Sequence, residues 1–194
     1  MTLRALLLAS MLACAAVAQA AATEEPRFEP TVRVADSALQ LNGYGVRTRF
    51  IIKAYTIALY LGGKADSLDA AMALAGPKRI EIVPLMGFSA TQFTEPLVKG
   101  MKKNLPPAEF DAMQPRIRAF VDDLAAVQEV KKGSRIALEW LPGRGTRATI
   151  DGGEVSRLVE GEDFYRALLA IWIGVKPTQD DLKELLLGAK PAQP

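Results

Sequence analysis

Three cations interrupt the most apolar stretch of the sequence. The segment 41–63 is LNGYGVRTRFIIKAYTIALYLGG, and Arg47, Arg49 and Lys53 stand among its β-branched and aromatic residues. A guanidinium is always charged and can bind two oxygen atoms of one anion at the same time. Cations in such a strand indicate either a salt-bridged strand edge or a pocket that holds an anion.

Few other groups in the sequence could carry out catalysis. Cys14 is the one cysteine, and there is no histidine. We expect Cys14 to be removed with the N-terminal segment, which would leave no thiol nucleophile, imidazole base or Cys/His metal ligand. Ser/His/Asp and Cys/His catalysis are therefore excluded, and no calcium-loop pattern is present. Catalysis would have to use Arg, Lys, Tyr or carboxylates, and we expect neither a metal nor a cofactor.

The first residues have the pattern of a secretory signal. Arg4 precedes an apolar run and then a small-residue motif, Ala-Gln-Ala, that ends at Ala20. The apolar run has ~13 residues, too few to span a bilayer as a helix. We expect a bacterial signal peptide over residues 1–20, cleavage near Ala20, a periplasmic location and no integral membrane segment after cleavage. Lipoprotein processing at Cys14 is the alternative, and it also implies export.

The total charge argues against polyanionic partners. The formal net charge is +2, from 24 basic and 22 acidic residues, whereas nucleic-acid binders show a clear basic excess. The same balance gives no reason to expect an anionic membrane surface as a partner. With 194 residues, the chain suits one domain. We expect a flexible leader at 21–30, one domain at 31–188 and a tail at 189–194.

Strand patterns are predicted early and late in the domain. The segment 41–63 is long for one strand, so we expect a bulge or tight turn between Phe50 and Lys53. Turns at 142–145 and 151–153 indicate two successive hairpins and hence a three-stranded antiparallel meander. The strand patterns cover 32–41, 51–61, 78–85, 134–141, 147–150 and 155–159.

Helical patterns separate and follow these strands. Residues 89–92 (SATQ) form a capping box, and Phe88 and Phe93 flank it as a hydrophobic staple. A further helical region begins at Pro107 and is predicted to be interrupted at Pro115. The helical patterns cover 66–76, 90–104, 106–124, 164–173 and 178–188. This order of elements predicts an α+β fold, because parallel βαβ units do not fit the last third of the chain.

Four segments, in this order, resemble a known family: GYGVR at 43–47, KAYTIALYL at 53–61, SATQFTEPLVKG at 89–100 and FYRALLAIWIG at 164–174. Together they resemble the chalcone isomerase-like family, in particular its exported bacterial branch, over roughly residues 31–188. The resemblance implies an open-faced β-sandwich, in which a large antiparallel sheet is backed by helices and a ligand cleft lies between them. Plant members close a chalcone to a flavanone, and other members bind fatty acids in the same cleft.

The resemblance also assigns residues to the cleft. Arg47 matches an arginine that faces the oxyanion in the enzymes and pairs with the carboxylate in the fatty-acid binders. Tyr55 matches a threonine of the enzymes but resembles a tyrosine of the binders. Phe93, Gly100 and Ala170 stand where the enzymes have tyrosine, asparagine and a hydroxyl residue, so the groups that order water and substrate are absent. The implied ligand-binding residues are Arg47, Tyr55, Phe93, Gly100 and Ala170.

The spacing of Arg47 and Tyr55 sets a condition on this assignment. Their segment is about four residues shorter than in the plant proteins, and on one continuous strand the two would lie ~26 Å apart. They can share a ligand only if the chain folds back between them. The simpler interpretation is that Arg47 pairs with Glu81 or Glu139 at a strand edge, and that the other two cations of the segment are solvated.

Three functions are compatible with this sequence. We favour a non-catalytic protein that binds a fatty acid or another small amphipathic acid, with Arg47 holding its head group. The second is an isomerase of the intramolecular lyase type, acting on an unknown substrate through Arg47 and Tyr55. The third is an interaction module of the cell envelope. Loss of Arg47 would lower affinity in the first case, abolish turnover in the second and change nothing in the third.

Overall fold

The structure is a computed structural model and describes residues 26–190. The predicted signal peptide of residues 1–20, with its cleavage position near Ala20, lies outside the described residues. Cys14 and residues 191–194 of the predicted tail also lie outside them. Export is therefore still an expectation from the sequence.

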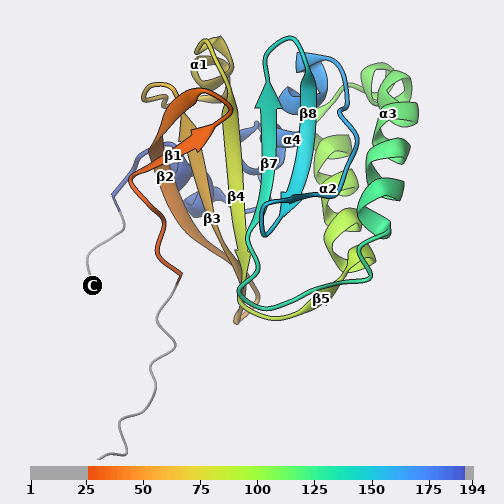
Figure 1. Cartoon of the computed structure of the whole chain (residues 1–194), viewed down its shortest axis with the longest axis horizontal. Coiled ribbons are helices and arrows are strands. Elements are labelled where there is room, and N and C mark those ends of the chain that lie inside the picture. The colour runs from red at the N-terminus through yellow and green to blue at the C-terminus, as the bar shows by residue number, and fades with distance from the viewer. Residues whose placement is uncertain (1–25, 191–194) are drawn as a thin grey trace, which may run out of the picture.

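An antiparallel sheet of seven strands forms the centre of the molecule, in the order β1-β2-β3-β4-β7-β8-β9 (Figure 1). Its strands are β1 Thr31–Val34, β2 Ser37–Arg49, β3 Ile52–Leu61, β4 Lys78–Pro84, β7 Ile136–Leu141, β8 Gly145–Ile150 and β9 Gly153–Glu154. Two short strands, β5 Phe88–Ser89 and β6 Glu129–Val130, pair separately. Turns join most neighbouring strands of the large sheet, so its topology is mainly that of successive hairpins.

Helices cover one side of this sheet. They are α1 Leu68–Ala73, α2 Ala90–Asn104, α3 Pro107–Ala125, α4 Glu162–Ile173 and α5 Asp180–Leu186. Helix α4 packs on the sheet and on α2, α3 packs on α2, and α5 packs on β2 (Figure 1). The predicted fold class, α+β with a large antiparallel sheet backed by helices, is confirmed.

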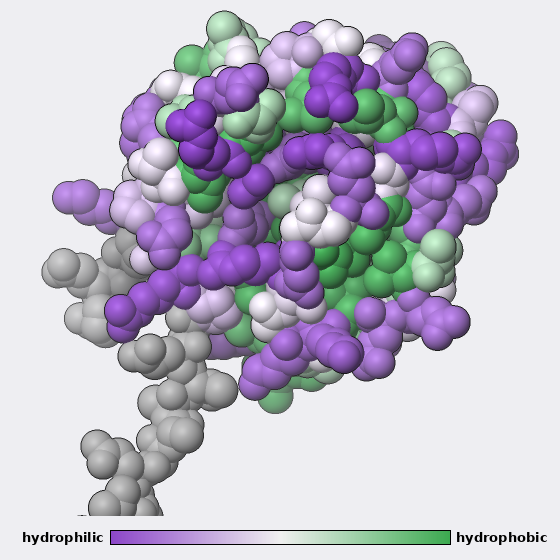
Figure 2. Space-filling model, viewed as in Figure 1, coloured by the Kyte–Doolittle hydropathy of each residue, from purple (hydrophilic) through white to green (hydrophobic). Residues whose placement is uncertain are grey.

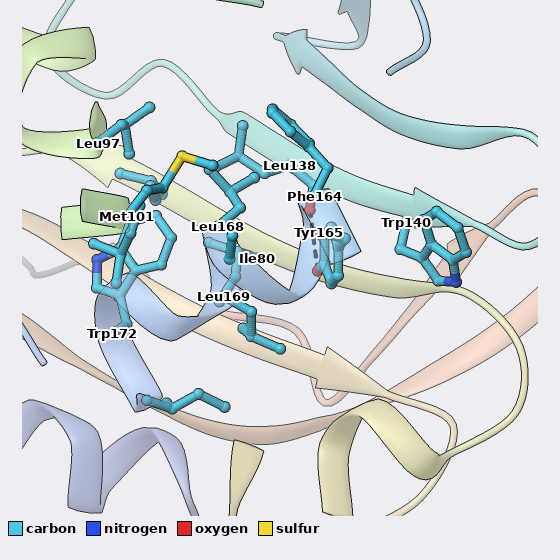
Figure 3. Close-up of a cluster of buried hydrophobic side chains, with 14 of the residues drawn as sticks. Ile80, Leu97, Met101, Leu138, Trp140, Phe164, Tyr165, Leu168, Leu169 and Trp172 are labelled. Atoms are coloured by element: carbon cyan, nitrogen blue, oxygen red, sulfur yellow. Dashed lines mark hydrogen bonds between the residues drawn. The ribbon is translucent and has the colours of Figure 1, made fainter. Parts of the chain in front are cut away.

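The hydrophobic core fills the space between sheet and helices. Along β4, Ile80 and Ile82 lie two positions apart, so both side chains face the helices, and both are buried. Helix α4 is apolar on nearly all sides and contributes buried residues from Phe164 to Ile173, which is why it lies at the centre of the layer. Figure 3 shows side chains from α2, α4 and the strands meeting in this core.

The other side of the sheet, which we call the outer side, carries charges. Glu139 is 1% exposed and accepts hydrogen bonds from Arg79 Nε and Arg147 Nε, both at 2.7 Å. Neighbouring strands supply the partners of the opposite sign, so the burial of these charges is compensated. Hydrophilic residues cover much of this side (Figure 2). The outer ion-pair network consists of Arg79, Glu81, Arg135, Glu139, Arg147 and Glu154.

The described part of the predicted leader contacts this outer side. The Tyr60 hydroxyl donates a hydrogen bond to the Glu29 carbonyl oxygen at 3.0 Å. Phe28 packs on a small apolar cluster of the outer side, with its ring 6.0 Å from that of Tyr44. Residues 26–30 thus cover part of the sheet although they form no strand or helix.

Two predicted features of the elements are wrong. Helix α3 is not interrupted at Pro115, because this proline faces solvent while Met113 and Ile117 keep the apolar side continuous. The third strand of the meander is not at 155–159: β9 is only Gly153–Glu154, and Val159 forms a single bridge to β8. The regular ladder is interrupted between Glu154 and Val159, because the Ala148 backbone N–H donates to the Ser156 side chain instead of to a carbonyl oxygen of the neighbouring strand.

Candidate functional site

A hairpin of β2 and β3 places Arg47 directly opposite Tyr55. The two residues are Cα partners in the antiparallel ladder, and the chain reverses at Phe50 and Ile51. A register shift follows Arg47, in agreement with the expected bulge or turn between Phe50 and Lys53. The condition set by the spacing is therefore met, since the chain folds back and brings the guanidinium and the phenol together.

Two glycines allow helix α5 to approach this hairpin closely. A Cβ atom on Gly43 would lie 2.0 Å from the Leu185 carbonyl oxygen, and one on Gly45 would lie 2.7 Å from Leu182 Cδ1. Any larger residue at these positions would push α5 away from β2. The closeness of the helix places Gln179, at its N-terminal cap, beside the residues that follow Gly45 on the strand.

The Gln179 side chain holds the backbone of β2 and the Arg47 side chain together. Its Oε1 accepts hydrogen bonds from the Thr48 backbone N–H at 2.9 Å and from Arg47 Nη1 at 3.0 Å. Its Nε2 donates to the Val46 carbonyl oxygen at 3.3 Å. Arg47 Nη1 also donates to the carbonyl oxygen of Thr48. The guanidinium is thus fixed through one of its nitrogens, and its other donors can contact a ligand.

Helix α4 contributes Trp172 to the same site. Its Nε1 donates a hydrogen bond to the Tyr55 hydroxyl at 2.9 Å. Burial raises the pKa of the Tyr55 phenol, although the Trp172 hydrogen bond and the nearby Arg47 charge oppose this effect. The phenol is therefore protonated at neutral pH. Because its oxygen already accepts from Trp172, its O–H can donate to an anion that Arg47 attracts.

The strand-edge interpretation of Arg47 is wrong. Glu81 pairs with Arg79 and Arg135, and Glu139 pairs with Arg79 and Arg147, all on the outer side of the sheet. Arg47 contacts Gln179 instead, beside the helices, and it has no carboxylate partner among residues 26–190. A half-buried arginine without such a partner is suited to binding an external anion.

The other three predicted site residues lie along the layer of α2 and α4. Phe93 is half-buried and stacks on Phe88 at a centroid distance of 5.5 Å, as the predicted staple requires. Gly100 faces α4, where an added Cβ would lie 2.8 Å from Ile171 Cγ2. Ala170 is buried in α4. The structure therefore joins Arg47 to Tyr55 and places Phe93, Gly100 and Ala170 in the helical layer behind them.

Sequence reasoning missed two residues of this site. Neither Trp172 nor Gln179 is among the residues that the sequence assigns to the cleft. An indole in a buried helix needs a hydrogen-bond acceptor, and this requirement is a signal that could have pointed to a tyrosine such as Tyr55. Gln179 stands at the start of a predicted helix, but no sequence signal connects that position with β2.

The space between sheet and helices is occupied by side chains. Leu97 and Met101 of α2 and Trp172 of α4 are each at most 4% exposed and lie in this layer (Figure 3). A surface cavity of about 440 Å³ lies elsewhere, near Asn42, Lys64 and Leu187, and a second of about 200 Å³ adjoins it. Neither of these two cavities is lined by Arg47 or Tyr55.

Residues 26–190 contain no group of three or more Asp, Glu, Cys or His side chains that could hold a metal ion. Within the same range, no helix has the length and hydropathy needed to cross a bilayer.

Comparisons with known proteins agree with the fold described above. A sequence model described as chalcone isomerase-like matches residues 20–188. Among solved structures, 37 chains match, and one of them is a fatty-acid binding protein of Arabidopsis thaliana. It has a TM-score of 0.65 and 17% identity, and the alignment covers 83% of this chain and 91% of that one. No curated protein matches the sequence. At this level of identity, the structural match supports the fold.

Proposed function

Because this chain belongs to the chalcone isomerase-like family, we propose that it binds a fatty acid or a similar small amphipathic acid without transforming it. One observation carries the proposal: Arg47 lies opposite Tyr55 with no carboxylate partner among the described residues. The similarity to a fatty-acid binding protein gives additional support.

The head group of the acid would bind to two donors. The Arg47 guanidinium supplies charge and two-pronged geometry for the carboxylate. Tyr55 supplies a neutral O–H, because burial raises its pKa and Trp172 occupies its acceptor side. Gln179 holds the guanidinium in position from behind. The same arrangement makes Tyr55 a poor general base at neutral pH, which favours binding over proton abstraction.

The apolar tail would enter the layer between the sheet and helices α2 and α4. Met101 lies in this layer, and a methionine side chain adapts to a new neighbour more easily than a branched or aromatic one. Phe93 and Ala170 would flank the path, and Gly100 would keep α2 close to α4. Each CH₂ group that leaves water contributes ~0.8 kcal/mol, which can offset the cost of moving side chains.

We further propose that the protein acts after export, as its N-terminal pattern indicates. N-terminal sequencing of the protein isolated from its native cells tests this point. Cleavage near Ala20 is the expected result, and a lipidated Cys14 would indicate the alternative route.

Mass spectrometry of the denatured wild-type protein tests the binding function. We expect about one acid per protein chain in the wild type, and its depletion in Arg47→Ala. Arg49→Ala is the matched control, since this arginine lies two positions along the same strand but is exposed. In a titration of delipidated protein with palmitate, the wild type and Arg49→Ala should bind with similar affinity, and Arg47→Ala should bind more weakly. An empty wild type that also fails to bind palmitate would refute the proposal, and Arg47-dependent turnover would replace it by an isomerase.

A further inference from the structure

The tip of the β2–β3 hairpin exposes a cluster of large apolar side chains. Phe50 and Ile51 are 91% and 94% exposed, and Ile52 follows them. Of the seven large hydrophobic residues that are exposed in the described chain, these three and Met86 belong to one end of the molecule. The concentration at one end distinguishes them from scattered surface hydrophobics, which need no explanation.

Three segments form this end, which we call the hairpin end: residues 47–53, 84–88 and 129–134. The Leu85 backbone N–H donates to the Ala54 carbonyl oxygen at 2.9 Å, next to the hairpin. The Gly133 backbone N–H donates to the Pro84 carbonyl oxygen, also at 2.9 Å. Figure 1 shows the hairpin turn and the connections around β5 gathered at the lower edge of the view.

Phe50 also has an unusual backbone conformation. Its φ angle is +57°, in the left-handed region that β-carbon-bearing residues other than Asn and Asp seldom occupy. The turns of the other hairpins place Ala35, Gly143, Asp151 and Gly152 in this region, and none of these has a large apolar side chain. An aromatic residue at this position therefore has a backbone cost in addition to its exposure to water.

Charge at the hairpin end is strongly one-sided. Basic residues outnumber acidic residues by five to one in its three segments. The cations are Arg47, Arg49, Lys53, Lys131 and Lys132, and the acid is Glu129. Arg49 Cζ lies 6.0 Å from the centre of the Phe50 ring, so a cation stands directly behind the apolar tip. At a bilayer surface the phosphates lie outside the acyl chains. An apolar tip could therefore reach the acyl chains while the cations behind it contact the phosphates.

We propose that the hairpin end docks on a bilayer that contains anionic lipid, with Phe50 and Ile51 inserted at the boundary of headgroups and acyl chains. The balanced net charge gave no reason to expect such a partner. The charge is unevenly distributed, however: the three segments of the hairpin end hold five basic residues and one acidic residue, whereas elsewhere Arg116 lies beside Asp163 and Arg157 beside Asp123. A protein partner fits less well, since the tip is convex and small, whereas specific protein interfaces bury ~800 Å² per partner.

Docking in this orientation would also place Arg47, at the base of the hairpin, toward the headgroups. An amphipathic acid could then pass between bilayer and protein without crossing bulk water. This consequence rests on the proposed function, whereas the membrane contact does not.

Co-sedimentation with vesicles tests the membrane contact. The wild-type protein should bind vesicles of equal parts phosphatidylcholine and phosphatidylglycerol, and bind poorly to phosphatidylcholine alone. The double variant Phe50→Asn/Ile51→Ser should bind about tenfold less, since its apolar insertion is lost. Asn suits the left-handed conformation, so the turn is preserved. Leu158→Ser is the matched control, because Leu158 is also exposed, at 40%, but lies outside the hairpin end.

Charge is tested separately with Lys131→Gln/Lys132→Gln, which should weaken binding to the anionic vesicles about fivefold or more. Lys103→Gln/Arg118→Gln removes two exposed cations of α2 and α3 and should have little effect. Tyr55→Phe removes a donor of the proposed acid site but no charge and no side chain of the hairpin end, so it should keep the vesicle binding while weakening the binding of the acid; failure of one proposal is therefore distinguishable from failure of the other. Wild-type protein that does not bind anionic vesicles, or a tip variant that binds like the wild type, would overturn the membrane contact. A tip-dependent dimer without vesicles would assign the tip to a second copy instead.

Discussion

The indole of Trp172 donates a hydrogen bond to the Tyr55 hydroxyl at 2.9 Å and so connects helix α4 to the strand opposite Arg47. The phenol oxygen is thereby used as an acceptor, so that its O–H can act as a donor.

Tyr55→Phe should lower the free energy of unfolding by about 1–3 kcal/mol, because the buried indole N–H of Trp172 loses its acceptor. Urea unfolding measures the change. In a Trp172→Phe background, where no N–H is left unpaired, the same substitution should cost much less. Equal costs in both backgrounds would mean that the hydrogen bond does not couple the two residues.

Gln179→Glu should weaken the binding of an acid by about tenfold. The new carboxylate would lie where Gln179 Oε1 now accepts from Arg47 Nη1 at 3.0 Å, and would therefore compete with the ligand for the guanidinium. Calorimetric titration with palmitate measures the change. Gln179→Ala removes the contact without adding charge, so a comparable loss in that variant would show that positioning, and not competition, is responsible.

Gly100→Ala should destabilise the protein, although alanine favours a helix over glycine by ~1 kcal/mol. The added Cβ would lie 2.8 Å from Ile171 Cγ2, and overpacking of this kind costs about 1–3 kcal/mol. Urea unfolding measures the change in unfolding free energy, and a decrease would show that overpacking outweighs the gain in helix propensity. In an Ile171→Ala background the same substitution should become harmless or stabilising, and an unchanged penalty there would contradict the proposed contact.

Glu139→Gln should lower the free energy of unfolding by about 3–5 kcal/mol, because it leaves Arg79 and Arg147 without the buried charge between them. Glu154→Gln is the matched control. Glu154 also pairs with Arg147, but its side chain is 61% exposed, so its loss should cost less than about 1 kcal/mol. Similar costs for the two variants would show that burial does not govern this network.

Stability should decrease as the pH rises above about 10, the ordinary pKa of a phenol. Burial raises the pKa of Tyr55, Tyr60 and Tyr165 in the folded protein, so the unfolded chain loses these protons first. The contribution is complete below the unfolded pKa and is lost as the pH rises toward the folded one. Lys78, whose pKa burial lowers, acts in the opposite direction.

Because the tyrosines and Lys78 act in opposite directions, the contribution of one phenol is measured by comparing the wild type with Tyr165→Phe in urea unfolding. Their urea midpoints should converge as the pH rises above about 10, since the variant has one phenol fewer to lose. A constant difference between the two midpoints would mean that Tyr165 does not contribute to the alkaline loss of stability.

Local signals predicted much of the fold. The capping box at Ser89 and Gln92 is formed by both of its hydrogen bonds, and α2 ends at the predicted residue, Asn104. Turn signals located the β7–β8 and β8–β9 hairpins, because glycines and short polar residues determine these two turns directly. The interruption at Pro115 was wrong because tertiary packing of one helix face outweighs the loss of a solvent-exposed hydrogen bond.

The site was harder to predict because it depends on contacts distant in sequence. Arg47 and Gln179 are 132 residues apart and meet only because glycines let α5 approach β2. Those glycines are visible in the sequence, but their neighbours are not. The opposition of Arg47 and Tyr55 likewise depends on the position of the reversal. The length of the apolar segment indicated a bulge or tight turn between Phe50 and Lys53, but not which residues would form it.

The reversal at Phe50 and Ile51 has a consequence for how this site can change in evolution. In an antiparallel hairpin, equal numbers of residues can be lost from the two strands and the same pair still lies opposite. The sequence resemblance implies a segment between Arg47 and Tyr55 about four residues shorter than in the plant members of the family, which would correspond to two residues from each strand in such a ladder. An odd change in length has to be absorbed by a bulge, as the register shift after Arg47 does here, or it turns one of the two side chains to the other side of the sheet. Arg47 and Tyr55 can thus stay opposite each other in evolution when the two strands lose or gain residues in equal numbers.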